Sequence, residues 1–310
     1  MLANLPVEII LLICEYPEFK DVGQLAWTNK RIMQIIKKYL PKALERKTLF
    51  HLYHENGDVK EGRICLFDSH TNSVEQIAKF TSDLWSYEVA TTKDKIFALD
   101  SKKELFEIFD LNTRQITRGP DPSEWRGCAS VAYFKDKLYY LGGCIPGTKN
   151  DTNRVDVLID GIWQTGPAFP FPITYAQTIT CDGILYVIDG YRSRKIFLLS
   201  DDEREWIEIG EFPEERGYFG VASLNGRIYI TGGSGWNGEF NSCLCFDPSA
   251  PVGNRISRIT NMNHARSDHS LVAANGKLFA IGGFLQGNFC NSIEEYDPQT
   301  NRWREVEKLT

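Results

Sequence analysis

Residues 277–283, KLFAIGG, are one of three close copies of a short pattern in which a run of aliphatic and aromatic residues ends in a glycine pair. The other two copies are RIYITGG at 227–233 and KLYYLGG at 137–143. Weaker copies end at Asp189-Gly190 and Asp100-Ser101, so the pairs begin at positions 100, 142, 189, 232 and 282. Steps of 42 to 50 residues between the pairs indicate an internal repeat of solenoid or propeller length.

Each unit contains four short runs with the alternation that is typical of β-strands rather than helices. In one unit these runs cover residues 177–181, 184–188, 195–199 and 205–209. Asp182-Gly183 separates the first two runs, and Asn225-Gly226 does the same in the next unit, which predicts tight β-hairpins. A repeated unit of four strands predicts a β-propeller in which each unit forms one blade.

The last unit gives the second half of the pattern most fully, because residues 292–303 read SIEEYDPQTNRW. A glycine pair, a tyrosine on the third strand (Tyr296) and a tryptophan on the fourth (Trp303) resemble a Kelch repeat. The resemblance is specific in the units that end near Phe169, Phe212, Met262 and Leu309, and looser in the two earlier units. With residues 49–78 counted as a partial unit that lacks its innermost strand, it implies an all-β Kelch β-propeller of about six four-stranded blades over residues 49–310.

The glycine pairs have a physical interpretation of their own. A backbone that bends sharply, or passes close to a neighbour, at the end of the second strand needs a residue without a Cβ atom. We therefore expect a close backbone approach at Gly142-Gly143, Gly232-Gly233 and Gly282-Gly283. Tryptophan and tyrosine side chains are expected to fill the wedge between blades.

The first 48 residues follow a helical pattern instead. Four apolar residues recur at helical spacing: Ile9, Leu12, Ile13 and Tyr16. Pro6 and Glu8 suit a first helical turn, and further helices are expected from Asp21 and after Thr28. Three short helices bury too small a core to be stable alone, so a partner is implied.

This segment resembles an F-box, the helical module that docks on the Skp adaptor of a cullin-RING ubiquitin ligase. The matching parts are Leu5-Pro6-x-Glu8-Ile9-Ile10 and Asp21-Val22-x-x-Leu25-Ala26-x-Thr28-Asn29-Lys30-Arg31. The resemblance implies a small N-terminal all-α F-box-like domain over residues 1–48, with the Skp adaptor and the cullin-RING ligase core as partners. The adaptor-facing residues that it implies are Leu5, Pro6, Ile9, Ile10, Leu25 and Ala26. The alternative is a helical cap that covers the first blade.

Charge divides the chain in the same way. Residues 1–48 hold eight Lys or Arg and five Asp or Glu, whereas residues 49–310 hold 27 and 36, which gives the propeller a net charge near −9. An acidic propeller is a poor phosphate binder, so no nucleic acid is expected as a partner. No apolar stretch has the length of a membrane span, and the run at 9–14 lacks the flanks of a signal peptide, so no membrane partner is expected.

Catalysis finds little support in the residue pattern. The eight cysteines lack metal-type pairs such as Cys-x-x-Cys, so we expect buried free thiols and a cytoplasmic or nuclear location. The five histidines show no metal-ligand pattern, and hydrolase and phosphate-loop motifs are absent from the sequence. The prediction is a non-enzyme with no catalytic residue, no metal and no cofactor. A small-metabolite isomerase is an alternative, because such a site needs only scattered polar groups in the channel.

Binding is expected on the face of the propeller where two sets of loops open. These are the loops between the second and third strands of a blade (B–C loops) and those between successive blades (D–A loops), and in Kelch receptors this face takes the substrate. The predicted substrate-binding residues are Arg126, Tyr191, Arg192, Arg216, Tyr218, Trp236, Arg266, His269 and Phe284. Tyr175 and Asp268 also belong to the D–A loops. Aromatic and arginine side chains dominate interface energies when they cluster in a desolvated centre.

Arg126, Arg216 and Arg266 stand at similar places in three units, which suggests an arginine-lined rim suited to an acidic peptide. The alternative is that arginines and histidines near the first strand hydrogen-bond within the propeller. Together, the resemblances imply the substrate-recognition subunit of an SCF-type cullin-RING ubiquitin ligase that binds a target protein. The alternatives are a Kelch interaction scaffold outside any ligase, for example for a cytoskeletal protein, and the metabolite isomerase.

Overall fold

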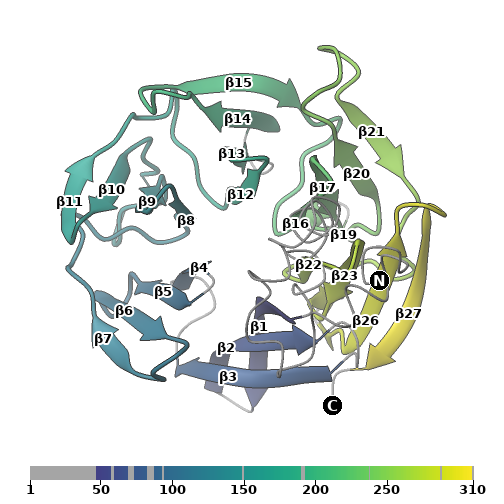
Figure 1. Ribbon diagram of the computed structural model, residues 1–310, viewed down its shortest axis with the longest axis horizontal. Coiled ribbons are helices and arrows are strands. Elements are labelled where there is room, and N and C mark those ends of the chain that lie inside the picture. The colour runs from purple at the N-terminus through teal and green to yellow at the C-terminus, as the bar shows by residue number, and fades with distance from the viewer. Residues whose placement is uncertain are drawn as a thin grey trace, which may run out of the picture.

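The computed structural model shows sheets arranged in a ring around a central axis (Figure 1). It describes residues 47–56, 59–68, 73–81, 87–92, 94–148, 150–189, 193–236, 238–286 and 288–308. The described residues form strands, turns and loops, and no apolar helix of membrane-spanning length occurs among them. The predicted N-terminal helices, with Leu5, Pro6, Ile9, Ile10, Leu25 and Ala26, lie outside the described residues.

Five antiparallel sheets of four strands are the blades of the propeller. Blade 1 contains β4 (Tyr87–Thr91), β5 (Lys95–Asp100), β6 (Leu105–Asp110) and β7 (Ile116–Arg118). Blade 2 contains β8 (Ser130–Phe134), β9 (Lys137–Leu141), β10 (Val155–Ile159) and β11 (Ile162–Thr165). Blade 3 contains β12 (Gln177–Cys181), β13 (Ile184–Asp189), β14 (Lys195–Leu199) and β15 (Trp206–Glu211). Blade 4 contains β16 (Gly220–Leu224), β17 (Arg227–Thr231), β20 (Cys243–Phe246) and β21 (Ile256–Ile259), and blade 5 contains β22 (Ser270–Ala274), β23 (Lys277–Ile281), β26 (Ser292–Asp297) and β27 (Arg302–Lys308).

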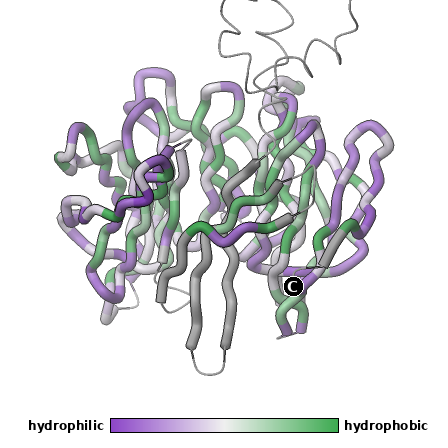
Figure 2. Tube along the Cα trace, turned by 60° about the horizontal axis from the view of Figure 1, so that its bottom comes forward, coloured by the Kyte–Doolittle hydropathy of each residue, from purple (hydrophilic) through white to green (hydrophobic). Residues whose placement is uncertain are grey.

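The first strand of each blade lies nearest the axis and the fourth lies outermost (Figure 1). The predicted hairpins between the first two strands are confirmed, because Asn225 and Gly226 both adopt positive φ (53° and 74°), as a tight hairpin turn requires. Hydrophobic residues concentrate in the strands and hydrophilic residues in the loops of both faces (Figure 2). The core is therefore a series of apolar layers between neighbouring blades.

The prediction of six four-stranded blades is wrong in its count. The sixth position of the ring holds a three-stranded sheet of β1 (Lys47–Asn56), β2 (Val59–Asp68) and β3 (Ser73–Thr81). β1 lies beside β22, the innermost strand of blade 5, so the prediction that this unit lacks its innermost strand is wrong. The fourth strand is the missing one, because only residues 82–86 separate β3 from β4, which is fewer than a further strand and its two turns would need. A repeat of fewer strands thus completes the ring beside five full blades.

Side-chain packing on both sides of the three-stranded sheet closes the ring. On one side, Phe67 of β2 packs against Phe279 of blade 5 with ring centroids 4.8 Å apart. On the other side, Ile77 of β3 packs in a cluster with Ile96 and Phe109 of blade 1. Closure among the described residues therefore comes from sheet-to-sheet packing and not from a blade shared by two distant segments.

The glycine pairs make the predicted close approaches. Gly232 has a φ of 59°, and a Cβ atom there would lie 2.4 Å from the carbonyl oxygen of Arg266 in the next blade. Trp303 on β27 also joins blades, because its indole N–H donates to the Thr260 carbonyl oxygen (2.9 Å) at the end of blade 4. Trp206 and Trp163 make matching bonds to Pro167 and Pro120. Both predicted roles, for glycine and for tryptophan, are confirmed.

Candidate binding face of the propeller

The B–C and D–A loops meet on one face, which we call the B–C face. In blades 2, 4 and 5, isolated β-bridges join the D–A loop to the B–C loop of the same blade, pairing Gly127 with Cys144, Gly217 with Ser234, and Ser267 with Phe284. In blades 4 and 5 the B–C loops continue as small hairpins, formed by β18 (Ser234–Gly235) with β19 (Gly238–Glu239), and by β24 (Phe284–Leu285) with β25 (Asn288–Phe289). The bridges anchor the base of each hairpin to the blade below it.

Arg266 does not reach this face. Its side chain is fully buried, and one guanidinium nitrogen donates to the carbonyl oxygens of Gly282 (3.0 Å) and Ser292 (3.1 Å). The other donates to the Ser292 hydroxyl and, at 2.7 Å, to the equally buried carboxylate of Glu294. Arg266 therefore ties its loop to the second and third strands of its own blade.

Arg216 and Arg126 do the same in blades 4 and 2. Arg216 donates to the Gly232 and Ser242 carbonyl oxygens and pairs with Glu214 at 2.5 Å. Arg126 pairs with buried Asp156 at 2.9 Å and lies 4.3 Å from the centre of the Tyr140 ring. All three arginine side chains are fully buried, so the predicted arginine-lined rim is wrong. The reason is that the strand ends of each blade present carbonyl oxygens and a polar side chain that a guanidinium satisfies.

His269 is also an internal residue. Its Nε2 atom shares a 2.8 Å hydrogen bond with the Thr231 hydroxyl of blade 4. Burial, together with nearby Arg266, lowers the pKa of His269 to about 3, so the ring stays neutral. The predicted substrate contact at His269 is therefore corrected to a bond between neighbouring blades.

Four other residues of the D–A loops lie around the axis at this face, and we call them the axial ring: Cys128, Tyr175, Tyr218 and Asp268. Each stands two residues before the innermost strand of its blade and has a left-handed backbone, with φ between 50° and 56°. The Tyr175 N–H donates to the Cys128 carbonyl oxygen (3.0 Å), and the Asp268 N–H donates to the Tyr218 carbonyl oxygen (2.8 Å). These bonds connect successive blades through the ring.

The axial ring combines aromatic and acidic groups. The Tyr175 and Tyr218 rings meet edge to face with centroids 5.2 Å apart. Burial raises the pKa of Asp268 to about 7, opposed only by a hydrogen bond from Ser267. Burial raises the pKa of the Cys128 thiol to about 12, and nearby Glu88 on β4 adds to this shift. Glu88 itself has a pKa well above its usual range because it is buried, so carboxylates lie near both ends of the ring.

Tyr218 is one of the site residues predicted from the sequence, but the ring as a whole is not. A signal was present: Cys128, Tyr218 and Asp268 each follow the blade arginine by two residues. Position 173, where the matching arginine would stand in blade 3, is an isoleucine, which hides Tyr175 from that pattern. Among the predicted contacts, Tyr191 and Arg192 lie outside the described residues.

The small hairpins present aromatic side chains at the B–C face. Trp236, at the turn of the β18–β19 hairpin, is 95% exposed. Its indole nitrogen lies 3.4 Å from a carboxylate oxygen of Glu215. In the β24–β25 hairpin the Phe284 and Phe289 rings pack together with centroids 4.3 Å apart, and Phe289 stays 39% exposed. Trp236 thus occupies an exposed position on this face, whereas Phe284 is half-buried.

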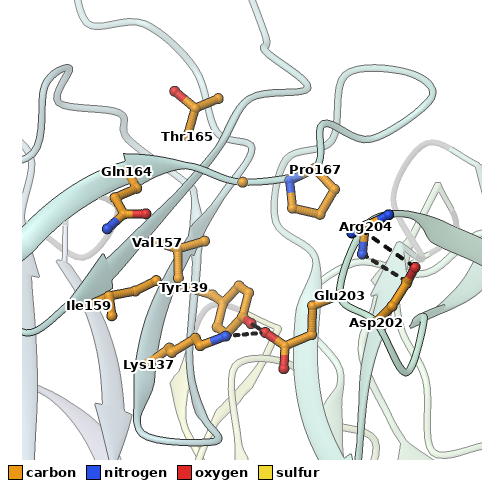
Figure 3. Close-up of a pocket in the computed structure, with 11 residues that line it drawn as sticks. Lys137, Tyr139, Val157, Ile159, Gln164, Thr165, Pro167, Asp202, Glu203 and Arg204 are labelled. Carbon is orange, nitrogen blue, oxygen red and sulfur yellow. Dashed lines mark hydrogen bonds and ion pairs between the residues drawn. The ribbon is translucent and has the colours of Figure 1, made fainter.

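A pocket of about 460 Å³ lies between blades 2 and 3, away from the B–C face (Figure 3). The Lys137 ammonium (2.5 Å) and the Tyr139 hydroxyl (2.8 Å) both donate to one carboxylate oxygen of Glu203, and Lys135 lies 3.4 Å from the other. Burial alone would raise the pKa of Glu203, but these three donors lower it. The groups satisfy one another, so we assign the cluster to packing between the blades.

Metal and thiol chemistry can be judged for the described part of the chain. No group of three His, Cys, Asp or Glu residues suited to a metal ion occurs among the residues described. All seven described cysteines are free thiols, and five of them are buried: Cys65, Cys128, Cys181, Cys243 and Cys245. The prediction of buried free thiols is confirmed for these five.

Comparisons with known proteins support a Kelch architecture. The Kelch motif model matches residues 215–252 and 265–310, which lie in blades 4 and 5. An F-box/kelch-repeat protein of Arabidopsis thaliana is 24% identical over 308 residues, which cover 92% of this chain and 78% of that protein. Kelch-like protein 36 of Mus musculus is 31% identical over 154 residues, which cover 46% of this chain and 25% of the mouse protein. The chain thus spans about a quarter of the mouse protein's length.

Two solved structures have the same fold. The structure of YjhT superposes with a TM-score of 0.62 at 13% identity and covers 73% of this chain and 84% of that one. A fungal alcohol oxidase of the AA5 family, in complex with copper, superposes with a TM-score of 0.60 at 15% identity and covers 85% of this chain and 63% of that one. At these identities the likeness concerns the fold alone. The chain therefore carries Kelch repeats folded as a β-propeller.

Proposed function

We propose that this chain is the substrate receptor of a cullin-RING ubiquitin ligase, in which the propeller binds a target protein through its B–C face. The observation that carries the binding role is the pair of anchored hairpins with Trp236 fully exposed and Phe284 and Phe289 beside each other. Large exposed aromatic side chains are the residues that become energetic centres of protein interfaces. The bridges at the base of each hairpin hold its backbone in place before binding, which lowers the entropic cost of association.

The ligase part of the proposal rests on the N-terminal sequence pattern and on one relative. Leu5, Pro6, Ile9, Ile10, Leu25 and Ala26 would contact the Skp adaptor, as the F-box pattern implies. The F-box/kelch-repeat relative from Arabidopsis thaliana matches this chain over most of its length, so the likeness includes more than the propeller.

The mechanism of such a receptor is proximity. The propeller would hold the target while other subunits of the ligase deliver ubiquitin, so the rate rises through effective concentration and not through a catalytic group in this chain. We accordingly propose no enzymatic activity and no cofactor for it. Cytoplasm or nucleus is the proposed location, where such a ligase would act.

The proposal is tested by mixing the full chain with a purified Skp adaptor bound to the N-terminal half of a cullin, and measuring complex formation by size-exclusion chromatography with light scattering. A stable complex is expected, and the double variant Leu5→Ala, Pro6→Ala should lose it. The matched control is Trp236→Ala with Phe284→Ala, which should keep adaptor binding. Absence of a complex with the folded, unchanged chain would contradict the ligase function.

A Kelch scaffold outside any ligase is the second candidate. The observation in its favour is that the mouse relative, which is 31% identical over the part that matches, is named for Kelch repeats and not for an F-box. It predicts the same aromatic binding face and no adaptor binding. The adaptor experiment therefore separates the two candidates directly.

A further inference from the structure

The axial ring offers a binding site whose chemistry differs from that of the aromatic hairpins. We propose that the axial ring binds a basic side chain, lysine or arginine, of the protein that the propeller recognises. This inference rests on the proposed protein-binding function and names the chemical class of the residue that enters the ring. It reverses the expectation of an acidic peptide, which depended on arginines that the structure places inside the blades.

The aromatic part of the ring suits a cation. Tyr175 and Tyr218 are partly exposed and meet at 5.2 Å, edge to face, so at least one ring face is turned away from the other ring. A lysine or arginine cation within about 6 Å of a tyrosine ring centre is attracted by the negative face of the ring. The backbone bonds from Tyr175 to Cys128 and from Asp268 to Tyr218 hold these groups in position before a ligand arrives.

Two carboxyl groups lie at the axial ring, that of Asp268 in the ring and that of neighbouring Glu88 on β4. Among the described residues, no Lys or Arg forms an ion pair with Asp268 or with Glu88. The guanidinium nearest in sequence, that of Arg266, is already bound to Glu294 and to backbone carbonyl oxygens. A partly buried carboxylate without a counter-ion is unfavourable when ionised, and an incoming cation would remove that cost.

The net negative charge of the whole propeller also favours a basic ligand. Residues 49–310 carry 27 Lys or Arg against 36 Asp or Glu, and three of those arginines are enclosed in blades. A net negative propeller accelerates the approach of a basic segment and slows that of an acidic one. The aromatic hairpins would then supply apolar contact area beside the ring, while the ring selects a basic residue.

The test titrates the full chain at pH 8 with Nα-acetyl-L-arginine amide and, separately, with Nα-acetyl-L-citrulline amide, which has nearly the same shape without the charge. Saturation-transfer NMR and calorimetry measure binding. The arginine amide is expected to bind at least tenfold more tightly than the citrulline amide. Equal binding of the two compounds, or no binding of the arginine amide, would overturn the proposal.

Asp268→Asn locates the site, because it removes the charge and keeps the size of the side chain. We expect it to weaken binding of the arginine amide at least tenfold, whereas Asp201→Asn, the same change at an exposed loop position of blade 3, leaves binding unchanged. If Asp268→Asn binds as well as the unchanged chain, the ring is not the site. Should this variant fail to fold, the arginine and citrulline comparison on the unchanged chain still decides the charge requirement.

The pH dependence of arginine-amide binding gives a second test of the role of Asp268. Besides burial, only a hydrogen bond with Ser267 shifts the pKa of Asp268, and its chain neighbour His269 stays neutral across this range because burial lowers the pKa of that ring to about 3. Because the pKa of free Asp268 is raised to about 7, arginine-amide binding should weaken about tenfold from pH 8 to pH 6. A flat profile would contradict a role for Asp268. Adaptor binding measured on the same samples is independent of this result, so failure of the ring and failure of the ligase function are distinguishable.

Discussion

Arg266 and Asp268 stand two residues apart in the same loop, yet the structure gives them opposite environments. The arginine is enclosed in blade 5 with five hydrogen-bond acceptors, whereas the aspartate lies partly exposed at the axial ring without an ion pair among the described residues. The same contrast separates buried Arg216 from partly exposed Tyr218, whereas in blade 2 both Arg126 and Cys128 are buried. The repeated arginine stabilises its own blade. The position two residues later differs from blade to blade and determines which chemical groups lie at the axial ring.

The largest effect is expected for Arg266→Ala. Removing the guanidinium leaves the Glu294 carboxylate buried without its cation, and breaking such a pair costs about 3–5 kcal/mol in the free energy of unfolding. Equilibrium urea unfolding measures the change. Arg304→Ala, at an exposed arginine that pairs with Glu295, is the control and should cost less than about 1 kcal/mol. Equal costs for the two variants would contradict the structural role of the buried arginine.

Arg216→Ala is expected to lower the free energy of unfolding by less than Arg266→Ala does. Its carboxylate partner, Glu214, is a third exposed and can be hydrated once the guanidinium is gone, whereas Glu294 cannot. The expected cost is about 1.5–3 kcal/mol, the range for a hydrogen bond to a charged group. Urea unfolding of both variants under the same conditions shows which one loses more free energy of unfolding. A cost at Arg216 above that at Arg266 would show that partner burial does not set the penalty.

Asp268→Asn is expected to change the pH dependence of stability. The pKa of Asp268 is raised by burial to about 7 in the folded chain, above its value near 4 when unfolded, so the folded state holds the proton longer. This aspartate therefore contributes stability below about pH 4, and that stability is lost as pH rises toward 7. Relative to the unchanged chain, the asparagine variant should melt at a higher temperature at pH 8, and the difference should fade toward pH 4. A constant difference from pH 4 to pH 8 would refute the raised pKa.

The smallest effect on stability is expected for Trp236→Ala. An exposed side chain at a hairpin turn contributes little to folding, so the free energy of unfolding should change by no more than about 0.5 kcal/mol. Once a protein target of the propeller is known, the same variant should weaken its binding at least tenfold, because an interface aromatic loses its contact area. Thermal melting and calorimetric titration provide the two values. A large loss of stability with unchanged binding would reverse the assignment.

The repeated features of the fold could be predicted from the sequence because they follow from local chemistry. Gly232-Gly233 marks a close backbone approach, Asn225-Gly226 marks a hairpin, and Trp303 marks a fourth strand, and each of these is visible within a few residues. The three-stranded sheet was harder to predict. The sequence predicts a partial unit without its innermost strand, whereas the structure lacks the fourth strand, because only residues 82–86 connect β3 to β4.

The binding face could be located from the sequence, but its chemistry could not. The acceptors that enclose Arg266 come from residues 280, 282, 292 and 294, which are 14 to 28 residues further along the chain, so no local pattern reveals that the arginine is bound within its own blade. The axial ring is likewise assembled from four blades that meet only at the axis. Trp236 was predicted correctly as exposed because a tryptophan in a glycine-rich hairpin has few neighbours to cover it. The adaptor-facing residues from Leu5 to Ala26 stay a prediction.

The most direct test of the distinction between the structural Arg266 and the binding residue Asp268 is urea unfolding of Arg266→Ala and Asp268→Asn. Both variants are compared with the unchanged chain at pH 7.5. We predict that Arg266→Ala lowers the free energy of unfolding by about 3–5 kcal/mol, whereas Asp268→Asn does not lower it. If Asp268→Asn lowered it as much as Arg266→Ala, the axial ring would be part of the structural framework, and the separation of blade-building and binding positions would be contradicted.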